Sequence, residues 1–169
     1  MIRTLWAAVL LWAALEAHPH TFIDVFPTLR DDSIAIRWVI DEMSSQMLIL
    51  DFDSDGDGTF SPSESDRVRD ELFSSLYDYG YYTYFYRGGK RLPAPKATGF
   101  RATIEEYKIN YHFTLPLPEG TEMIRFYDAE NFSAFFLKDV NDRSSEEGHP
   151  WKSRKLGEAY GFGYELERR

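Results

Sequence analysis

Residues 53–64 constrain the fold of this chain most, because they match a calcium-binding loop that must lie between two helices. The twelve positions carry acidic side chains at the first, third and fifth places and a glycine, Gly58, at the sixth, where the chain turns sharply. The expected ligands are Asp53, Asp55, Asp57, Thr59 through its backbone carbonyl, Ser61 and Glu64. Oxygen donors in this number suit Ca²⁺ and not a soft transition metal. The alternative is an acidic surface turn that binds nothing.

Helical patterns stand on both sides of the loop. Asp41 is a fair N-cap, and apolar residues follow it at helical spacing. The residues that form these patterns are Met43, Met47 and Leu50 before the loop and Val68, Leu72 and Leu76 after it. Gly80 is a typical helix stop. We therefore predict an EF-hand-like helix–loop–helix at about residues 41–80.

Most of the remaining chain shows the alternation of apolar and polar residues that is typical of β-strands. Strands are expected at residues 21–29, 34–40, 82–86, 107–115, 123–127, 132–137 and 160–166. The polar stretch at residues 139–156 reads as a loop. The predicted fold class is α+β, an antiparallel β-sandwich-like sheet with an inserted helix–calcium loop–helix.

The N-terminus has the pattern of a secretory signal. One positive charge, Arg3, precedes an uncharged apolar run at residues 5–15 that is too short to span a bilayer. Cleavage after Ala17 would leave a single mature domain, residues 18–169, in the periplasm, with no membrane insertion. The chain has no cysteine, and its formal net charge of −9 argues against nucleic acid as a partner.

Cleavage at this point would also create a nitrogen-rich site. His18 would bear the free α-amine beside its imidazole, and His20 would add a second imidazole. Such ligands favour Ni²⁺, Co²⁺, Zn²⁺ or Cu²⁺ over Ca²⁺. A further ligand is needed, and His112 is the main candidate, with Asp24, Asp128 and His149 behind it. The alternative is a plain N-terminal tripeptide and an exposed strand histidine.

Several segments, in this order, resemble a known family. They are residues 18–24, Asp41 with Glu42, residues 53–64, 81–84, 112–117 and 126–128. The chain resembles a family of functionally uncharacterised bacterial periplasmic proteins, the periplasmic component of an unassigned ABC-type transport system. The resemblance covers residues 18–137, whereas the part from Asp139 on differs from the family's short ending. Members often accompany nickel, cobalt or zinc transport genes, which implies a role in handling metals.

Three functions follow from these features. The leading one is an exported calcium-binding protein that handles a divalent transition metal as accessory to a membrane metal transporter, and not an enzyme. The second is a calcium-ordered interaction module that binds no transition metal. The third is a histidine-brace copper enzyme, which would share the mature N-terminal histidine but lacks a visible second ligand set. No nucleophile–base pair, phosphate loop or zinc motif is present in the sequence.

Overall fold

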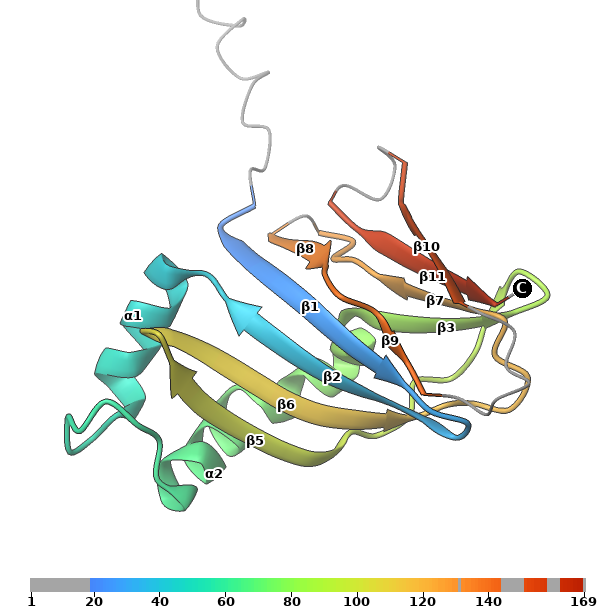
Figure 1. Cartoon of the computed structure of the whole chain (residues 1–169). Coiled ribbons are helices and arrows are strands. Elements are labelled where there is room, and N and C mark those ends of the chain that lie inside the picture. Colours follow the sequence, from blue (N-terminus) through green and yellow to red (C-terminus); the bar gives the residue numbers. More distant parts are fainter. Residues whose placement is uncertain (1–18, 131, 144–150, 158–161, 169) are drawn as a thin grey trace, which may run out of the picture.

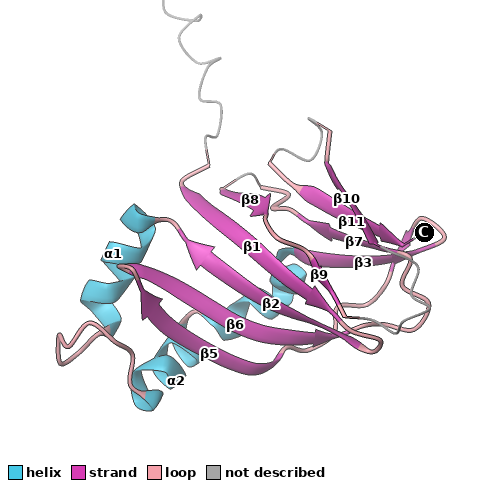
Figure 2. Ribbon diagram, in the orientation of Figure 1, coloured by secondary structure: helices cyan, strands magenta, loops and turns pink. Residues whose placement is uncertain are grey.

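The chain folds into two β-sheets with a helical segment between the second and third strands (Figures 1 and 2). The computed structural model describes residues 19–168 except 131, 144–150 and 158–161. Its strands are β1 (Thr21–Leu29), β2 (Ser33–Ile40), β3 (Thr83–Arg87), β4 (Lys90–Arg91), β5 (Thr98–Glu105), β6 (Lys108–Pro116), β7 (Met123–Phe126), β8 (Ser133–Leu137), β9 (Asn141–Asp142), β10 (Trp151–Lys155) and β11 (Tyr164–Arg168). Its helices are α1 (Glu42–Phe52), α2 (Pro62–Glu71) and the 3₁₀ segment η1 (Phe73–Tyr82).

The strands form one six-stranded and one five-stranded sheet. Sheet A has the order β5-β6-β2-β1-β8, with β9 also paired to β1, and sheet B has the order β10-β11-β7-β3-β4. The α+β class is therefore confirmed. The sheets are not purely antiparallel, however, because β1 runs parallel to both β8 and β9. The chain returns to this edge of sheet A, at β8, directly after β7 of sheet B.

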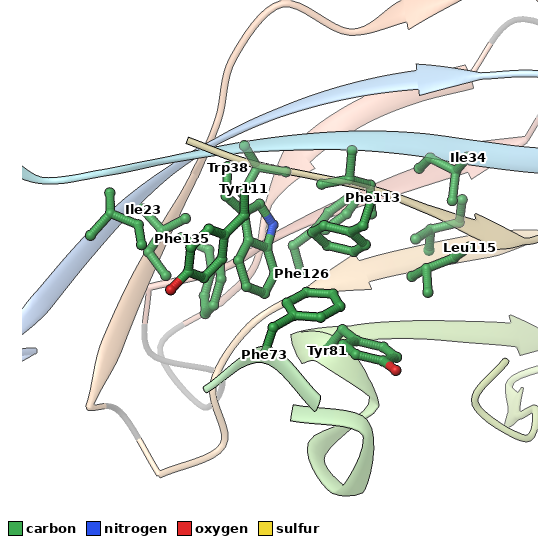
Figure 3. Packing of buried hydrophobic residues seen from close by; sticks show 14 of the residues in the cluster. Ile23, Ile34, Trp38, Phe73, Tyr81, Tyr111, Phe113, Leu115, Phe126 and Phe135 are labelled. Atoms are coloured by element: carbon green, nitrogen blue, oxygen red, sulfur yellow. The ribbon is translucent and has the colours of Figure 1, made fainter. Parts of the chain in front are cut away.

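One hydrophobic core joins the two sheets (Figure 3). Alternate residues of β1, β2 and β6 are buried, as the sequence pattern predicts for strands with one face in the core. Trp38 of β2 lies at the centre, with its ring centroid 5.0 Å from that of Phe113 and 5.6 Å from that of Phe135. Phe85 and Phe126 of sheet B belong to the same cluster and are fully buried. Aromatic side chains thus make up a large share of this core.

The helical segment is fixed to sheet A by one buried serine from each helix. Ser45 of α1 accepts a hydrogen bond from the Ile109 backbone N–H at 3.0 Å. Ser65 of α2 accepts one from the Ala102 backbone N–H at 2.9 Å. The second bond satisfies an N–H on β5, an edge strand that would otherwise expose it. Phe73 of η1 then stacks on Phe100 of β5, with ring centroids 4.2 Å apart.

Three features differ from the sequence prediction. Strand β5 was not expected, because residues 98–105 carry few large apolar side chains. Residues 139–156 were expected to be a loop, yet they contain β9 and β10. Strand β10 has one buried residue, Trp151, followed by four exposed ones, and it is held by antiparallel pairing with β11 rather than by a buried face. Such an edge strand carries no alternation to detect.

Two further details refine the prediction. Tyr107 was placed on the apolar face of a strand, but it lies in the β5–β6 turn with a positive φ and is 80% exposed. Helix α2 ends at Glu71, earlier than Gly80, although Gly80 does take a left-handed conformation within η1. None of the helices in the described part of the chain has the length and apolarity needed to cross a bilayer.

Candidate calcium-binding loop

Residues 53–64 connect α1 to α2, so the loop has a helix on each side as its sequence requires. Asp41 caps α1 by accepting a hydrogen bond from the Ser44 backbone N–H at 2.9 Å, which confirms the predicted N-cap. Helix α1 ends at Phe52, and the backbone N–H of its C-cap residue, Asp53, donates to the Ile49 carbonyl at 2.9 Å. The first residue of the loop is therefore held by the last turn of α1.

The three loop aspartates converge on one small region. One carboxylate oxygen from each of Asp53, Asp55 and Asp57 lies within 4.8 Å of the other two. The carboxylate of Asp53 accepts hydrogen bonds from the Gly56 and Gly58 backbone N–H groups, both at 3.0 Å. These glycines have φ angles of 69° and 81°, which the tight turn requires. The backbone thus folds around the carboxylates.

Glu64 approaches the loop from the first turn of α2. Its side chain is buried, with 7% exposed, and reaches back across the loop to accept a hydrogen bond from the Ser54 backbone N–H at 2.6 Å. Its other oxygen accepts hydrogen bonds from the Ser61 backbone N–H at 3.0 Å and from the Ser61 hydroxyl at 2.9 Å. With Ser61 as N-cap, this is a capping box. Hydrogen bonds from Ser61 and then from Ser54 lower the pKa of Glu64.

Arg67 is a further residue of this region that the sequence analysis missed. One guanidinium nitrogen donates to the Ser54 hydroxyl at 2.9 Å, and another donates to the Asp51 carbonyl. The guanidinium also lies 4.7 Å from the ring centroid of Phe52 and pairs with Glu71 at 3.3 Å. The available signal was its position, one helical turn after Glu64. Arg67 holds the end of α1 against α2 without pairing with any loop aspartate.

The loop therefore presents hard oxygen donors around a common point. Carboxylate oxygens each have two acceptor positions, so an oxygen that accepts a backbone N–H can still bind a cation. The three aspartates are close enough to repel one another strongly unless a cation lies between them. The donor chemistry and the geometry of the turn fit Ca²⁺.

The predicted nitrogen ligands are placed apart. His18 and His149 lie outside the described residues, and His20 is exposed at the start of β1, where its backbone N–H donates to the Phe132 carbonyl at 2.8 Å. His112 lies on β6, level with Arg37 of β2, which is level with Phe26 of β1. His20 comes six residues before Phe26, a distance of roughly 20 Å along an extended strand. The structure does not bring His20 and His112 together.

The two aspartates considered as further ligands have other partners. Asp24 forms an ion pair with Lys138 at 3.2 Å. Asp128 is buried and accepts hydrogen bonds from the Glu130 and Ser133 backbone N–H groups, at 2.9 and 3.0 Å. Asp128 therefore stabilises the turn between β7 and β8.

Comparison with known proteins gives two relatives of limited similarity. A Haemophilus influenzae protein, described as an uncharacterized protein, is 24% identical over 108 residues, which is 60% of this chain and 50% of the relative. A Spirochaeta aurantia protein, described as an uncharacterized 15.5 kDa protein in the trpE 3′ region, is 31% identical over 70 residues, 41% of this chain and 50% of the relative. The chain thus spans about half the length of these relatives. No solved structure matches it.

A family model covers far more of the chain. The model described as "Protein of unknown function (DUF1007)" matches residues 4–155, which include all of sheet A, sheet B except β11, the two α-helices and the whole acidic loop. The match extends well beyond half of the sequence, so the chain belongs to the DUF1007 family.

Proposed function

We propose that this chain is an exported calcium-binding protein that handles a divalent transition metal, Ni²⁺, Co²⁺, Zn²⁺ or Cu²⁺, as accessory to a membrane metal transporter. Its role on this proposal is binding and not catalysis. One observation carries the calcium part: the carboxylates of Asp53, Asp55 and Asp57 converge in a glycine-turned loop between two helices. Glu64 completes the ligand pattern from the helix that follows.

The attachment of the flanking helices supports a structural role for the proposed calcium site rather than a sensor role. Both flanking helices are tied to sheet A through Ser45 and Ser65, so their separation is fixed by the sheet. Calcium sites of extracellular modules bind with Kd on the order of 10⁻⁴–10⁻³ M. At such affinity an exported protein would be filled at ambient calcium and would gain stability from it.

Titration calorimetry with calcium tests this part. Asp55→Ala should abolish binding, because it removes one expected ligand. Among the described residues the Asp55 carboxylate accepts one hydrogen bond, a long one of 3.3 Å from the Asp57 backbone N–H, so little else should be lost. Asp51→Asn is the matched control, since it removes the same charge just outside the loop and should bind as the parent does. Equal calcium affinity in all three proteins would refute the loop as the site.

The transition-metal part rests on the expected mature N-terminus. An α-amine and imidazole on His18, with the exposed imidazole of His20 two residues later, offer nitrogen donors at one end of the chain. Protein purified from the cell envelope should begin at His18 by mass spectrometry. Its nickel or copper affinity should fall in His20→Ala and in a form with an extra N-terminal residue, while calcium binding stays unchanged. Peroxide-dependent oxidation by the copper-loaded protein would instead favour a copper enzyme.

A second candidate, the calcium-ordered interaction module, has its own supporting observation. Met43, Met47 and Leu50 of α1 are 67%, 67% and 84% exposed, so an apolar stripe of this helix faces away from the sheet. Tyr107, in the turn before β6, is also highly exposed. Such apolar side chains are suited to contact a protein partner. Protein from the cell envelope that contains calcium but no transition metal would favour this function.

A further inference from the structure

The outer face of sheet A carries a row of side chains drawn from four neighbouring strands. Phe26 of β1 is level with Arg37 of β2, Arg37 with His112 of β6, and His112 with Arg101 of β5. The residues before and after Phe26, Arg37 and His112 in their strands are buried in the core, so these three side chains point outward.

Arg37 is held in a fixed orientation. Its guanidinium lies 3.9 Å from the centroid of the Phe26 ring, and one of its nitrogens donates to the side-chain oxygen of buried Asn110 at 3.1 Å. No carboxylate of the described residues pairs with Arg37 or with Arg101. A chain with 28 acidic and 19 basic residues has carboxylates to spare, so a positioned arginine without one indicates a place for an external anion.

A cavity of about 420 Å³ opens on this face. Among its lining residues are Arg37 and His112 on one side and Asp139 and Asn141 on the other. Asn141 is level with Thr28 of β1, so the order across the cavity is β6, β2, β1 and β9. Asp139 lies just before β9, and within the described part of the chain it forms no ion pair. A guanidinium and a carboxylate, neither of them in an ion pair within the described residues, therefore line one cavity without reaching each other.

We propose that this cavity binds a small amino acid-like zwitterion, with its carboxylate on Arg37 and His112 and its ammonium group on Asp139. The ligand would then supply a partner of opposite charge for the Arg37 guanidinium and for the Asp139 carboxylate. The Phe26 ring and Ala35, between the two ends, offer an apolar floor for the carbon chain. Asn141, Thr28 and Thr114 supply further hydrogen-bonding groups for a small polar molecule.

The charges of the cavity exclude two simpler ligands. A dianion such as phosphate would satisfy Arg37 but would lie against the carboxylate of Asp139. A metal cation would lie beside the Arg37 guanidinium, with Asp139 as the one carboxylate among the described residues of the lining, which disfavours it electrostatically. A ligand with one charge of each sign avoids both penalties.

Heteronuclear NMR titration of the calcium-saturated protein tests the proposal. The probes are glycine and 4-aminobutyrate as zwitterions, propionate as carboxylate alone and methylamine as amine alone, each to 20 mM at pH 7. Both zwitterions should shift the side-chain signals of Arg37 and His112. The Kd obtained from these shifts should be at least tenfold lower for a zwitterion than for propionate or methylamine. Absence of any shift at these residues with either zwitterion would overturn the site.

Variants separate the two ends of the ligand. Arg37→Gln should weaken zwitterion binding at least tenfold, and Asp139→Asn should reduce it to the level of propionate. Arg30→Gln and Glu119→Gln remove the same charges at exposed positions away from the cavity and should bind as the parent does. Arg37→Lys keeps the positive charge and serves as the control for misfolding of Arg37→Gln. Its affinity for the zwitterion should lie between those of the parent and Arg37→Gln. Equal affinity for glycine in the parent and in Asp139→Asn would show that Asp139 binds no ammonium group, and would overturn the proposal of a zwitterionic ligand.

Discussion

The carboxylates of the acidic loop and the carboxylate of buried Glu165 have opposite kinds of partner. In sheet B, the carboxylate of Glu165 is fully buried and is paired by Arg125 at 3.0 Å and by Arg154 at 2.5 Å. In the loop, three aspartates lie within 4.8 Å of one another, and their hydrogen bonds come from backbone and hydroxyl groups. Within the described residues, two arginines therefore pair with the one buried acid, whereas none pairs with the cluster of three acids.

This difference indicates how each region obtains its stability. Glu165 is neutralised by residues of the chain itself, so its contribution is present whenever the protein is folded. No cationic side chain of the described residues pairs with the loop aspartates, so on the proposed calcium site part of the loop's stability would depend on an external cation. Arg67, the nearest arginine, contacts Ser54, Asp51 and Glu71 instead of the three aspartates. The comparison can be tested from both sides.

Removing Glu165 should have the largest effect. Glu165→Ala leaves the part-buried Arg125 without its carboxylate, and we expect a loss of about 3 kcal/mol in the free energy of unfolding. Urea denaturation measures this loss, which should be the same with and without calcium. Arg154→Gln is the control, because that side chain is 68% exposed and its loss should cost less than about 1 kcal/mol. A calcium-dependent loss in Glu165→Ala would contradict the distinction between the two regions.

Calcium should produce the next largest effect. At a free concentration of a hundred times Kd, we expect a gain of about 2.7 kcal/mol, seen as a higher melting temperature. Asp55→Ala should lose only this gain. Glu64→Ala should lose the gain and also melt earlier without calcium, because Glu64 closes the capping box of α2. A melting temperature unaffected by millimolar calcium or by chelator would show that the loop is no structural calcium site.

Breaking the attachment of α1 to sheet A should have a smaller effect. Ser45→Ala removes the acceptor for the Ile109 backbone N–H, and the expected loss is about 2 kcal/mol. The helix, not the loop, is altered, so calcium should still raise the melting temperature by its usual amount. Ser74→Ala, at an exposed serine of η1 outside the loop, is the matched control and should cost far less. Thermal unfolding with and without calcium distinguishes these effects.

The smallest expected effect concerns pH. Burial, followed by the nearby Arg101, lowers the pKa of His112 below its usual 6.5, although Glu105 acts in the opposite direction. The unfolded chain then binds a proton more readily than the folded one, so stability should decline slightly as pH falls through 6.5. Arg101→Gln should raise the pKa of His112, measured by NMR titration of the ring. An unchanged pKa in this variant would remove Arg101 as a cause.

Local spacing predicted the features that are built from neighbouring residues. All expected calcium ligands lie within the acidic loop, residues 53–64, and the N-cap of α1 was visible at Asp41. The first two strands and β6 were recognised because apolar and polar residues alternate along them. The helix of residues 42–52 was also recognised, although its apolar stripe of Met43, Met47 and Leu50 faces outward.

Features that depend on contacts between residues far apart in the sequence could not be predicted from local spacing. Strand β5 was missed because Phe100, Ala102 and Ile104 alternate with small or polar residues too weakly to stand out. Strand β10 depends on its pairing with β11. The attachment of α2 through Ser65 to Ala102 joins residues 37 positions apart, and no local pattern marks either partner.

The sequence by itself determined the acidic loop, its flanking helices and the faces of the principal strands, because backbone geometry fixes which side chains share a side over a few residues. The tertiary structure alone decided that β1 lies between β2 and β8, with β8 parallel to it, and that Arg37, His112 and Asp139 line one cavity. Strand order depends on how the whole hydrophobic core closes, with Trp38 at its centre. Many pairings satisfy the local pattern equally, and only the packing of the complete chain selects one.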